Sequence, residues 1–218
     1  MKFAALSDIH GEAAALRRVW EDIGRRGLGG ETVLNAGDIV AYGADTMACI
    51  DFVRDPARKI VSVFGNYDRN AARFPEKEKS YKRKWSVLRP AKFQALRRAS
   101  AELTDDARAW LADLPSLRWL GLGAVSATLS HYAPPEGKEG LYDDTPEARL
   151  WQIAAQCAPA RLIVVGHTHA PFVRRVGRTL FVNPGSVGRA WDGPTYAEIE
   201  IETDDIDARI IQCPASPP

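Results

Sequence analysis

Five short apolar runs in this chain each end in an Asp, Asn or His side chain. The polar residues that follow the runs are Asp8-Ile9-His10, Gly37-Asp38, Gly65-Asn66, His131 and Gly166-His167-Thr168-His169. Helical patterns separate the first three runs, and such alternation is typical of βαβ units and a largely parallel sheet. Ligands of open α/β sheets bind beyond the carboxyl ends of the strands. We therefore expect an α/β fold with these side chains gathered at one edge.

The rest of the chain extends this plan. Helices are predicted over residues 12–26, 46–54 and 148–156, and strands over 3–6, 32–34, 60–64, 124–129 and 162–165. The runs at 173–176, 180–182, 196–201 and 206–211 predict antiparallel strands. Residues 70–113 contain no β-like run and predict two or three helices, broken near Pro90 and restarting at Thr104-Asp105. We expect a single domain over residues 1–213 and a disordered tail over 214–218.

Composition excludes several classes of protein. The 29 basic and 28 acidic residues nearly cancel, which argues against a globally basic nucleic-acid binder and against an acidic disordered chain. Three scattered cysteines form no Cys-x-x-Cys pair, so a disulfide framework is not expected. No apolar run has the roughly 18–20 residues that a membrane span needs. A cytoplasmic protein with no membrane partner is predicted.

The polar set has the chemistry of a metal centre. It contains two Asp, one Asn and four His, which is too many ligands for one ordinary zinc site but suits two metals bridged by one carboxylate. Mixed nitrogen and oxygen ligands favour Mn, Fe, Zn, Co or Ni over Ca. Each residue alone has a simpler interpretation: Asp8 as a helix N-cap, Gly65-Asn66 as a turn, and any one histidine as a packed side chain.

The ordered set resembles the signature of the calcineurin-like metallophosphoesterase superfamily. Its pattern is Asp-x-His, Gly-Asp, Gly-Asn-His-Glu/Asp, a lone His and Gly-His-x-His, and residues 8 to 169 match all five blocks in order. Residues 37–43 and the loop Asn183-Pro184-Gly185-Ser186-Val187-Gly188 resemble a small bacterial phosphodiesterase branch. The resemblance implies a four-layer α/β/β/α sandwich of two mixed sheets flanked by helices, with a helical insertion around residues 70–113.

The resemblance also implies a function, a dinuclear metal-dependent phosphoesterase in which a metal-bridging water or hydroxide attacks the phosphate ester. The cofactors are two divalent metal ions, Mn first, with Fe, Zn, Co or Ni as alternatives. The resemblance implies that one metal is bound by Asp8, His10, Asp38 and His169, and the other by Asn66, His131 and His167, with Asp38 bridging. Catalytic roles fall to Asp38, Asn66, Tyr67 and His131, and substrate contacts to Tyr42, Arg69 and Ser186. The loop 183–188 is expected beside Gly166-His167-Thr168-His169, where its backbone N–H groups could face an oxyanion.

One departure from the family pattern bears on the substrate. Tyr67 stands where the third block usually carries a histidine that assists the leaving group. Tyrosine, with an ordinary pKa of about 10, is a poorer match to general acid work at neutral pH. Phosphodiesters are therefore favoured over monoesters, and the role of Asp68 is left open.

Two other functions remain as alternatives. A catalytically inactive protein-binding scaffold of the same fold, such as the eukaryotic retromer subunit, need not keep four histidines, and metal content after purification would distinguish it. A Ser/Thr protein phosphatase would carry arginine in the second block and His in the third, whereas this chain has Ala41-Tyr42-Gly43 and Tyr67. A phosphopeptide assay would test that alternative.

The segment 69–98 is strongly basic. It holds eleven basic residues against Glu76 and Glu78, with four aromatic residues interleaved. The net charge of the whole chain is near zero because this basic segment is balanced by an acidic remainder. This composition is consistent with binding of a nucleotide or another polyanion in addition to the phosphate-ester substrate. A solvated helical cap with its aromatic side chains packed on the core is the simpler interpretation.

Overall fold

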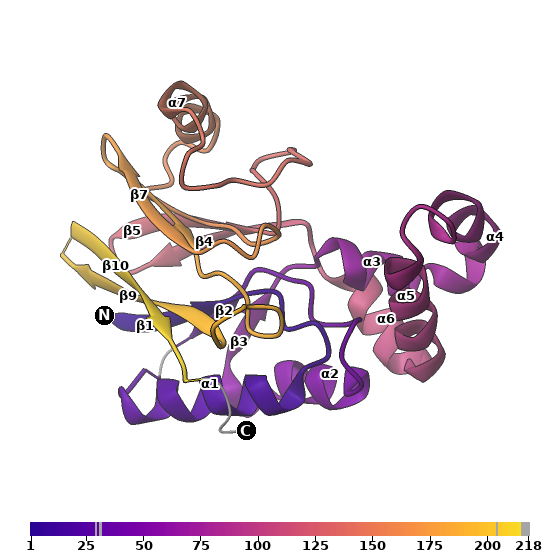
Figure 1. The fold of residues 1–218 in the computed structure, drawn as a ribbon. Coiled ribbons are helices and arrows are strands. Elements are labelled where there is room, and N and C mark those ends of the chain that lie inside the picture. The colour runs from indigo at the N-terminus through magenta and orange to yellow at the C-terminus, as the bar shows by residue number, and fades with distance from the viewer. Residues whose placement is uncertain (29, 31, 204, 215–218) are drawn as a thin grey trace.

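The computed structural model describes residues 1–28, 30, 32–203 and 205–214, and these residues form two five-stranded sheets. The first sheet has the order β10-β9-β1-β2-β3 and the second the order β4-β5-β6-β8-β7 (Figure 1). The strands of the first sheet are β1 (Lys2–Leu6), β2 (Val33–Asn35), β3 (Ile60–Ser62), β9 (Thr195–Glu202) and β10 (Asp205–Gln212). Those of the second are β4 (Leu117–Leu122), β5 (Val125–Ser130), β6 (Leu162–Val164), β7 (Phe172–Val176) and β8 (Thr179–Asn183).

Both sheets are mixed. Strands β1, β2 and β3 are parallel, as are β5, β6 and β8, and the predicted ligands follow the carboxyl ends of these parallel strands. Antiparallel strands flank them: β9 pairs with β1, β4 with β5, and β7 with β8. The antiparallel strands predicted near the C-terminus are present, but they are divided between the sheets, and β8 also pairs in parallel with β6.

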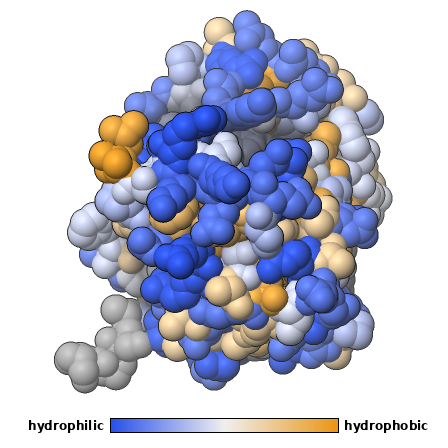
Figure 2. Space-filling view, turned by 90° about the vertical axis from the view of Figure 1, so that its right-hand side faces the viewer, coloured by the Kyte–Doolittle hydropathy of each residue, from blue (hydrophilic) through white to orange (hydrophobic). Residues whose placement is uncertain are grey.

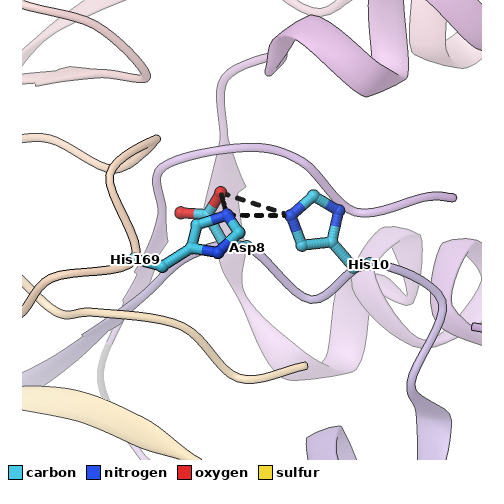
Figure 3. A group of neighbouring side chains, drawn as sticks. All are labelled: Asp8, His10 and His169. Carbon is cyan, nitrogen blue, oxygen red and sulfur yellow. Dashed lines mark hydrogen bonds and ion pairs between the residues drawn. The ribbon is translucent and has the colours of Figure 1, made fainter. Parts of the chain in front are cut away.

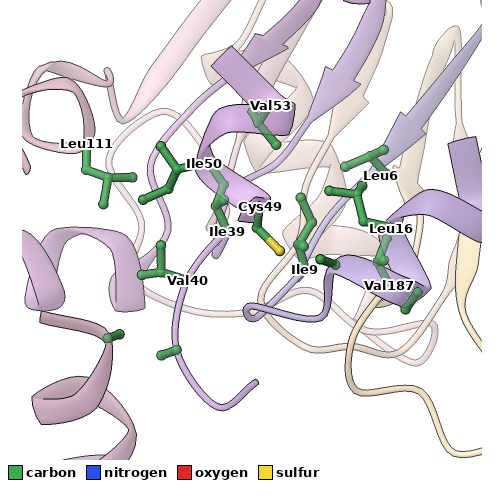
Figure 4. Close-up of a cluster of buried hydrophobic side chains, with 14 of the residues drawn as sticks. Leu6, Ile9, Leu16, Ile39, Val40, Cys49, Ile50, Val53, Leu111 and Val187 are labelled. Atoms are coloured by element: carbon green, nitrogen blue, oxygen red, sulfur yellow. The ribbon is translucent and has the colours of Figure 1, made fainter. Parts of the chain in front are cut away.

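Helices complete a four-layer sandwich, which confirms the expected fold class. Helices α1 (Ala13–Arg25) and α2 (Thr46–Arg54) cover the outer face of the first sheet, and α7 (Glu147–Gln156) covers that of the second (Figure 1). A short 3₁₀ helix, η1 (Pro56–Arg58), precedes β3. Separate clusters of buried apolar side chains lie between successive layers. Ile9 and Ile39, next to Asp8 and Asp38 in sequence, point into the cluster beneath α1 and α2 and so anchor both polar turns (Figure 4).

The segment after β3 holds four helices, of which the last three occupy the stretch 70–113 that was predicted to hold two or three. They are α3 (Asn66–Ala72), α4 (Phe74–Trp85), α5 (Pro90–Glu102) and α6 (Asp105–Asp113). Pro90 begins α5, and the Thr104 side chain caps α6 by accepting a hydrogen bond from the Ala107 N–H, as expected of both breaks. The additional helix, α3, starts directly at Asn66, so the third polar block lies in its first turn. Phe74, Trp85 and Phe93 are buried, as a packed cap requires.

Strand β4 is absent from the sequence-based expectation, which placed the next strand at residue 124. It is an edge strand with Arg118 and Trp119 largely exposed, so it has little of the apolar pattern that marks a buried strand. Of the predicted tail, residues 215–218 lie outside the described residues. Within the described part of the chain, no helix combines the length and apolar character that crossing a membrane requires.

Candidate metal centre

The carboxyl ends of strands from both sheets meet at one site. The first sheet contributes Asp8 and His10 after β1, Asp38 after β2 and Asn66 after β3, and the second contributes His131 after β5 and His167 and His169 after β6. Two groups of converging ligand atoms result, one of Asp8, His10 and His169 and one of Asp8, Asp38 and His131. The site therefore lies where the two sheets face each other, at the position that the strand-end pattern predicts.

The first group is centred on Asp8. The Asp8 Oδ1 atom lies 3.1 Å from His169 Nε2 and 3.6 Å from His10 Nε2, and the two Nε2 atoms are 3.1 Å apart (Figure 3). Asp8 Oδ1 is buried and, among the residues that the structure describes, has no hydrogen-bond partner. This buried carboxylate oxygen and the two imidazole nitrogens that it faces together form a set of ligand atoms that fits a divalent cation.

The second group is centred on Asp38 and His131. His131 Nε2 lies 3.3 Å from both Asp38 Oδ2 and Asn66 Oδ1, while His131 Nδ1 lies 2.8 Å from the Ala36 carbonyl oxygen. Nδ1 donates to that carbonyl, which leaves Nε2 facing the site, and this is the arrangement of metal-binding histidines. Asp8 belongs to both groups of converging atoms, and Asp38 Oδ2 is 3.9 Å from His10 Nε2 of the first group.

His167 is near this centre but belongs to neither group of converging atoms. Its ring centre lies 5.1 Å from that of His131 and 4.5 Å from that of Tyr132. Its backbone N–H donates to Asp8 Oδ2 at 3.0 Å, and Ser7 Oγ donates to the same oxygen at 2.6 Å. The assignment of His167 to a metal stays a prediction.

Charge at the site favours a bound cation. Burial acts to raise the pKa of Asp8 and of Asp38, but hydrogen bonds and charge from the nearby histidines overcome it and hold both pKa values below their usual range. Burial acts to lower the pKa of His131, and the Asp38 and Asp8 carboxylates raise it to about 9. Two buried, ionised carboxylates therefore draw positive charge into the site.

The backbone at the site is strained. Five predicted ligands have positive φ angles: Asp8 (55°), His10 (52°), Asp38 (56°), His167 (74°) and His169 (58°). Non-glycine residues rarely adopt this left-handed region, and when they do they cluster at functional sites. The strain turns side chains at the ends of separate strands toward a common point. No sequence pattern identified these angles.

Glycines let the polar turns approach each other closely. A Cβ atom on Gly65 would lie 2.1 Å from Asp38 Oδ1, and one on Gly166 would lie 2.1 Å from Ser7 Oγ. Any larger residue at either position would displace the Asp8 or Asp38 turn. The glycines before Asn66 and His167 are therefore explained by the close approach of neighbouring turns.

Asp68, whose role the sequence left open, holds two of these turns together. Its Oδ1 accepts hydrogen bonds from the Ile39 N–H at 2.8 Å and the Val40 N–H at 3.1 Å, and its Oδ2 accepts one from the Gly65 N–H at 2.9 Å. The side chain is fully buried, and burial with the nearby Asp38 charge raises its pKa to about 6. Asp68 thus connects the Asp38 turn to the start of α3.

We expect Asp68→Ala to lower the free energy of unfolding by roughly 3–6 kcal/mol, because it leaves three buried N–H groups without an acceptor. Asp68→Asn is the matched variant: its amide oxygen can still accept from Ile39 and Val40, so it should be less destabilising. Urea denaturation of both variants and the wild type measures the difference. Equal stability of Asp68→Ala and the wild type would contradict this role.

The loop 183–188 lies beside residues 166–169, as predicted. Asn183 Nδ2 donates to the Gly166 carbonyl oxygen at 3.0 Å and to Thr168 Oγ1 at 2.9 Å. The expectation that its N–H groups face an oxyanion is wrong, because those of Val187 and Gly188 donate to the Ser7 and Asp8 carbonyl oxygens. Ser186 is also fully buried, and its Oγ donates to the Asp8 carbonyl oxygen at 2.8 Å. The loop thus holds the Asp8 backbone in place through hydrogen bonds, and the buried position of Ser186 does not favour contact with substrate.

The predicted substrate contacts Tyr42 and Arg69 differ in placement. Tyr42 lies beside the candidate metal centre. Its hydroxyl hydrogen-bonds the Tyr67 hydroxyl, and the centre of its ring is 5.3 Å from that of the His10 ring. Tyr67 is equally close, with its ring centre 5.1 Å from that of His10 and its N–H 2.7 Å from Asp38 Oδ1. The Arg69 guanidinium lies over the Phe64 ring, 5.3 Å from its centre, and its contact with substrate stays a prediction.

Sequence reasoning missed three residues around the centre. Tyr132 donates its hydroxyl to Asn66 Oδ1 at 3.1 Å, and its position directly after His131 was the only signal for it. Lys92 Nζ lies 4.5 Å from the centre of the Tyr67 ring, and Arg189 Cζ lies 4.0 Å from that of Tyr42. Nothing in the sequence distinguished Lys92 from the other cations of its segment.

Comparison with known proteins agrees with the strand-end motifs. The model of the calcineurin-like phosphoesterase superfamily domain matches residues 1–204. An uncharacterized protein of Methanocaldococcus jannaschii is 28% identical over 207 residues, which cover 87% of this chain and 77% of that protein.

Two solved structures have a similar fold. A hypothetical protein of Pyrococcus horikoshii has a TM-score of 0.82 at 22% identity, over 97% of this chain and 87% of that one. A metallophosphoesterase of Sphaerobacter thermophilus has a TM-score of 0.69 at 24% identity, over 97% and 88%. At these identities the two structures support the fold rather than a particular substrate.

Proposed function

Because this chain belongs to the calcineurin-like phosphoesterase superfamily, we propose that it is a dinuclear metal-dependent phosphoesterase that hydrolyses phosphodiesters. The observation that carries the proposal is the buried Asp8 Oδ1, which has no hydrogen-bond partner among the described residues and faces the Nε2 atoms of His10 and His169. The adjoining pair of Asp38 and His131 supplies a second set of donor atoms. A protein-binding scaffold has no need for such an arrangement of buried charge.

Each residue has a role that follows from its position. Asp8, His10 and His169 would hold one cation and Asn66, His131 and His167 the other, with Asp38 shared because its Oδ2 is near both His10 and His131. When bound, two divalent cations, Mn first, supply a water of lowered pKa and neutralise charge on the phosphoryl oxygens. Tyr132 orients Asn66 through its hydrogen bond to Oδ1, and the Ala36 carbonyl oxygen orients His131.

Tyr67 accounts for the proposed preference for diesters. Burial raises the pKa of its hydroxyl above the ordinary value, and the hydrogen bond with Tyr42 raises it further. Tyr67 therefore stays a neutral phenol that can donate a hydrogen bond but is a weak proton donor to a leaving group. Hydrolysis should then depend on how easily the leaving group departs without a proton.

We expect clear hydrolysis of aryl diesters and weak hydrolysis of alkyl monoesters, because an aryl diester expels a stabilised phenolate whereas an alkyl monoester expels a poor alkoxide. Tyr67→His should raise monoester turnover relative to diester turnover by at least about tenfold, since general acid assistance is typically worth ~10²–10⁴-fold. The measurement is kcat/KM with added Mn for bis(p-nitrophenyl) phosphate and for an alkyl monophosphate.

Tyr67→Phe is the matched control, because it keeps the ring and removes only the hydroxyl. If Tyr67 instead hydrogen-bonds the phosphate, Tyr67→Phe will raise KM for both substrates and Tyr67→His will favour neither. A wild-type enzyme that prefers alkyl monoesters would overturn the argument from the missing histidine.

A further inference from the structure

Lys92, in the basic segment 69–98, lies beside Tyr67 at the candidate metal centre, and Arg98 of the same segment donates to the Tyr42 carbonyl oxygen. Lys92 lies on α5, half-buried, with its Nζ 4.5 Å from the centre of the Tyr67 ring and 4.8 Å from that of Trp85. Burial lowers its pKa, and the Asp38 carboxylate opposes that shift, which places Lys92 within electrostatic range of the centre. No ion pair to Lys92 is present in the described part of the chain, so no protein carboxylate neutralises its charge.

Arg189 occupies a similar position on the other tyrosine. It follows the loop 183–188, and its Cζ lies 4.0 Å from the centre of the Tyr42 ring. Its side chain is exposed, and its charge acts to lower the pKa of Tyr67, against the larger effect of burial. Among the described residues, Arg189 has no carboxylate partner either.

The two cations therefore flank one hydrogen-bonded pair of tyrosines. The Tyr42 and Tyr67 ring centres are 4.9 Å apart, and both rings stand edge-on to His10. Cation–π contacts hold the two side chains in place without neutralising their charge, which leaves both free to bind an anion. The face that carries the insertion is largely hydrophilic, so charged groups there are accessible to a solute (Figure 2).

We propose that Lys92 and Arg189 form an anion clamp for a second phosphate of the substrate, beyond the phosphate that is hydrolysed. The proposal rests on the phosphoesterase function above and names its substrate class: phosphodiesters that carry a further phosphate group. In this proposal the second phosphate lies beside the tyrosine pair and draws both flexible side chains toward it, whereas a diester without that phosphate engages neither. Both residue types bind phosphate well: the planar guanidinium of arginine can donate two parallel hydrogen bonds, and the ammonium group of lysine is a compact positive charge.

The test compares two substrates that differ only in the second phosphate. They are the p-nitrophenyl ester of thymidine 5′-monophosphate and the same ester of thymidine 3′,5′-bisphosphate, from which the same bond is cleaved. The wild type should have a kcat/KM about tenfold higher for the bisphosphate ester, through a lower KM, because charge-assisted hydrogen bonds to phosphate are strong. Lys92→Met and Arg189→Met should each reduce this ratio about threefold, and the double variant should bring it close to one.

Two variants serve as controls. Lys92→Arg keeps the charge and should retain most of the preference. Lys82→Met removes the same charge from an exposed position on α4 and should leave the ratio unchanged. Equal effects of Lys82→Met and Lys92→Met would overturn the clamp, because the preference would then reflect general charge.

Binding distinguishes failure of the clamp from failure of the proposed function. Calorimetry of the metal-loaded protein with thymidine 3′,5′-bisphosphate and thymidine 5′-monophosphate should show tighter binding of the bisphosphate, lost in the double variant. Hydrolysis of both esters at equal rates by wild type and variants would overturn the clamp and leave the phosphoesterase function standing. Selective bisphosphate binding without hydrolysis of either ester would support the clamp and overturn the proposed function.

Discussion

Asp38→Asn is expected to lower kcat/KM for an aryl diester by at least about 100-fold, since losing even an outer partner of a metal ligand typically costs 10–100-fold. Asp38 is buried, lies 3.3 Å from His131 and 3.9 Å from His10, and is the carboxylate that we propose to bridge the two metals. The amide would remove negative charge from both groups while keeping the side chain's shape. Metal content per chain should fall with activity.

The control for this variant is Asp113→Asn, which makes the same chemical change at an exposed position at the end of α6. It should leave activity and metal content unchanged. Thermal unfolding of both variants separates loss of the site from loss of the fold. An Asp38→Asn enzyme with full activity and two bound metals would contradict the bridging assignment.

Chelation is expected to abolish activity, and Mn, Co or Ni should restore it. Four imidazoles among seven proposed ligands favour these metals, whereas Mg prefers oxygen ligands and retains its water. We expect activity with Mg to be at least about tenfold lower than with Mn. The measurement is diester hydrolysis by chelator-treated, dialysed protein against the concentration of each metal.

A circular dichroism spectrum after chelation is the control, because it shows whether the fold survives without metal. Full recovery with Mg and none with Mn would contradict the role of the histidines as ligands. Activity that persists after chelation would count against a metal-dependent mechanism as a whole.

The order of the strand-end motifs predicted the fold class and the family correctly because both depend on local patterns that recur along the chain. Buried parallel strands such as β1 and β6 are short apolar runs that end in polar turns, and the helices between them have apolar side chains at helical spacing. Strand β4 was missed because an exposed edge strand buries little and has a weak pattern. The division of the C-terminal strands between two sheets depends on long-range pairing, which local periodicity does not encode.

In the candidate site, too, some features follow from the local sequence and others from long-range packing. The predicted ligands are brought together because each follows a strand end, but the positive φ angles that orient them arise from packing between distant turns. The functions of Asp68 and Ser186 depend on which backbone groups they reach across the site, and these contacts cannot be read from neighbouring residues. Lys92 and Arg189 each contact one ring of the tyrosine pair, so the relation between them depends on how the insertion and the loop after β8 pack around that pair.

The pairing of β9 with β1 has a consequence for synthesis of the chain. Strand β1 is made well before β9, yet one of its edges pairs with β9, and the Met1 amino group bonds the Ile201 carbonyl oxygen across a sequence separation of 200. Until β9 is made, β1 keeps an apolar, unpaired edge of the kind that recruits strands from other molecules. The nascent chain therefore carries an aggregation-prone strand from the synthesis of β1 to that of β9, and a chaperone that covers β1 would protect it during that interval.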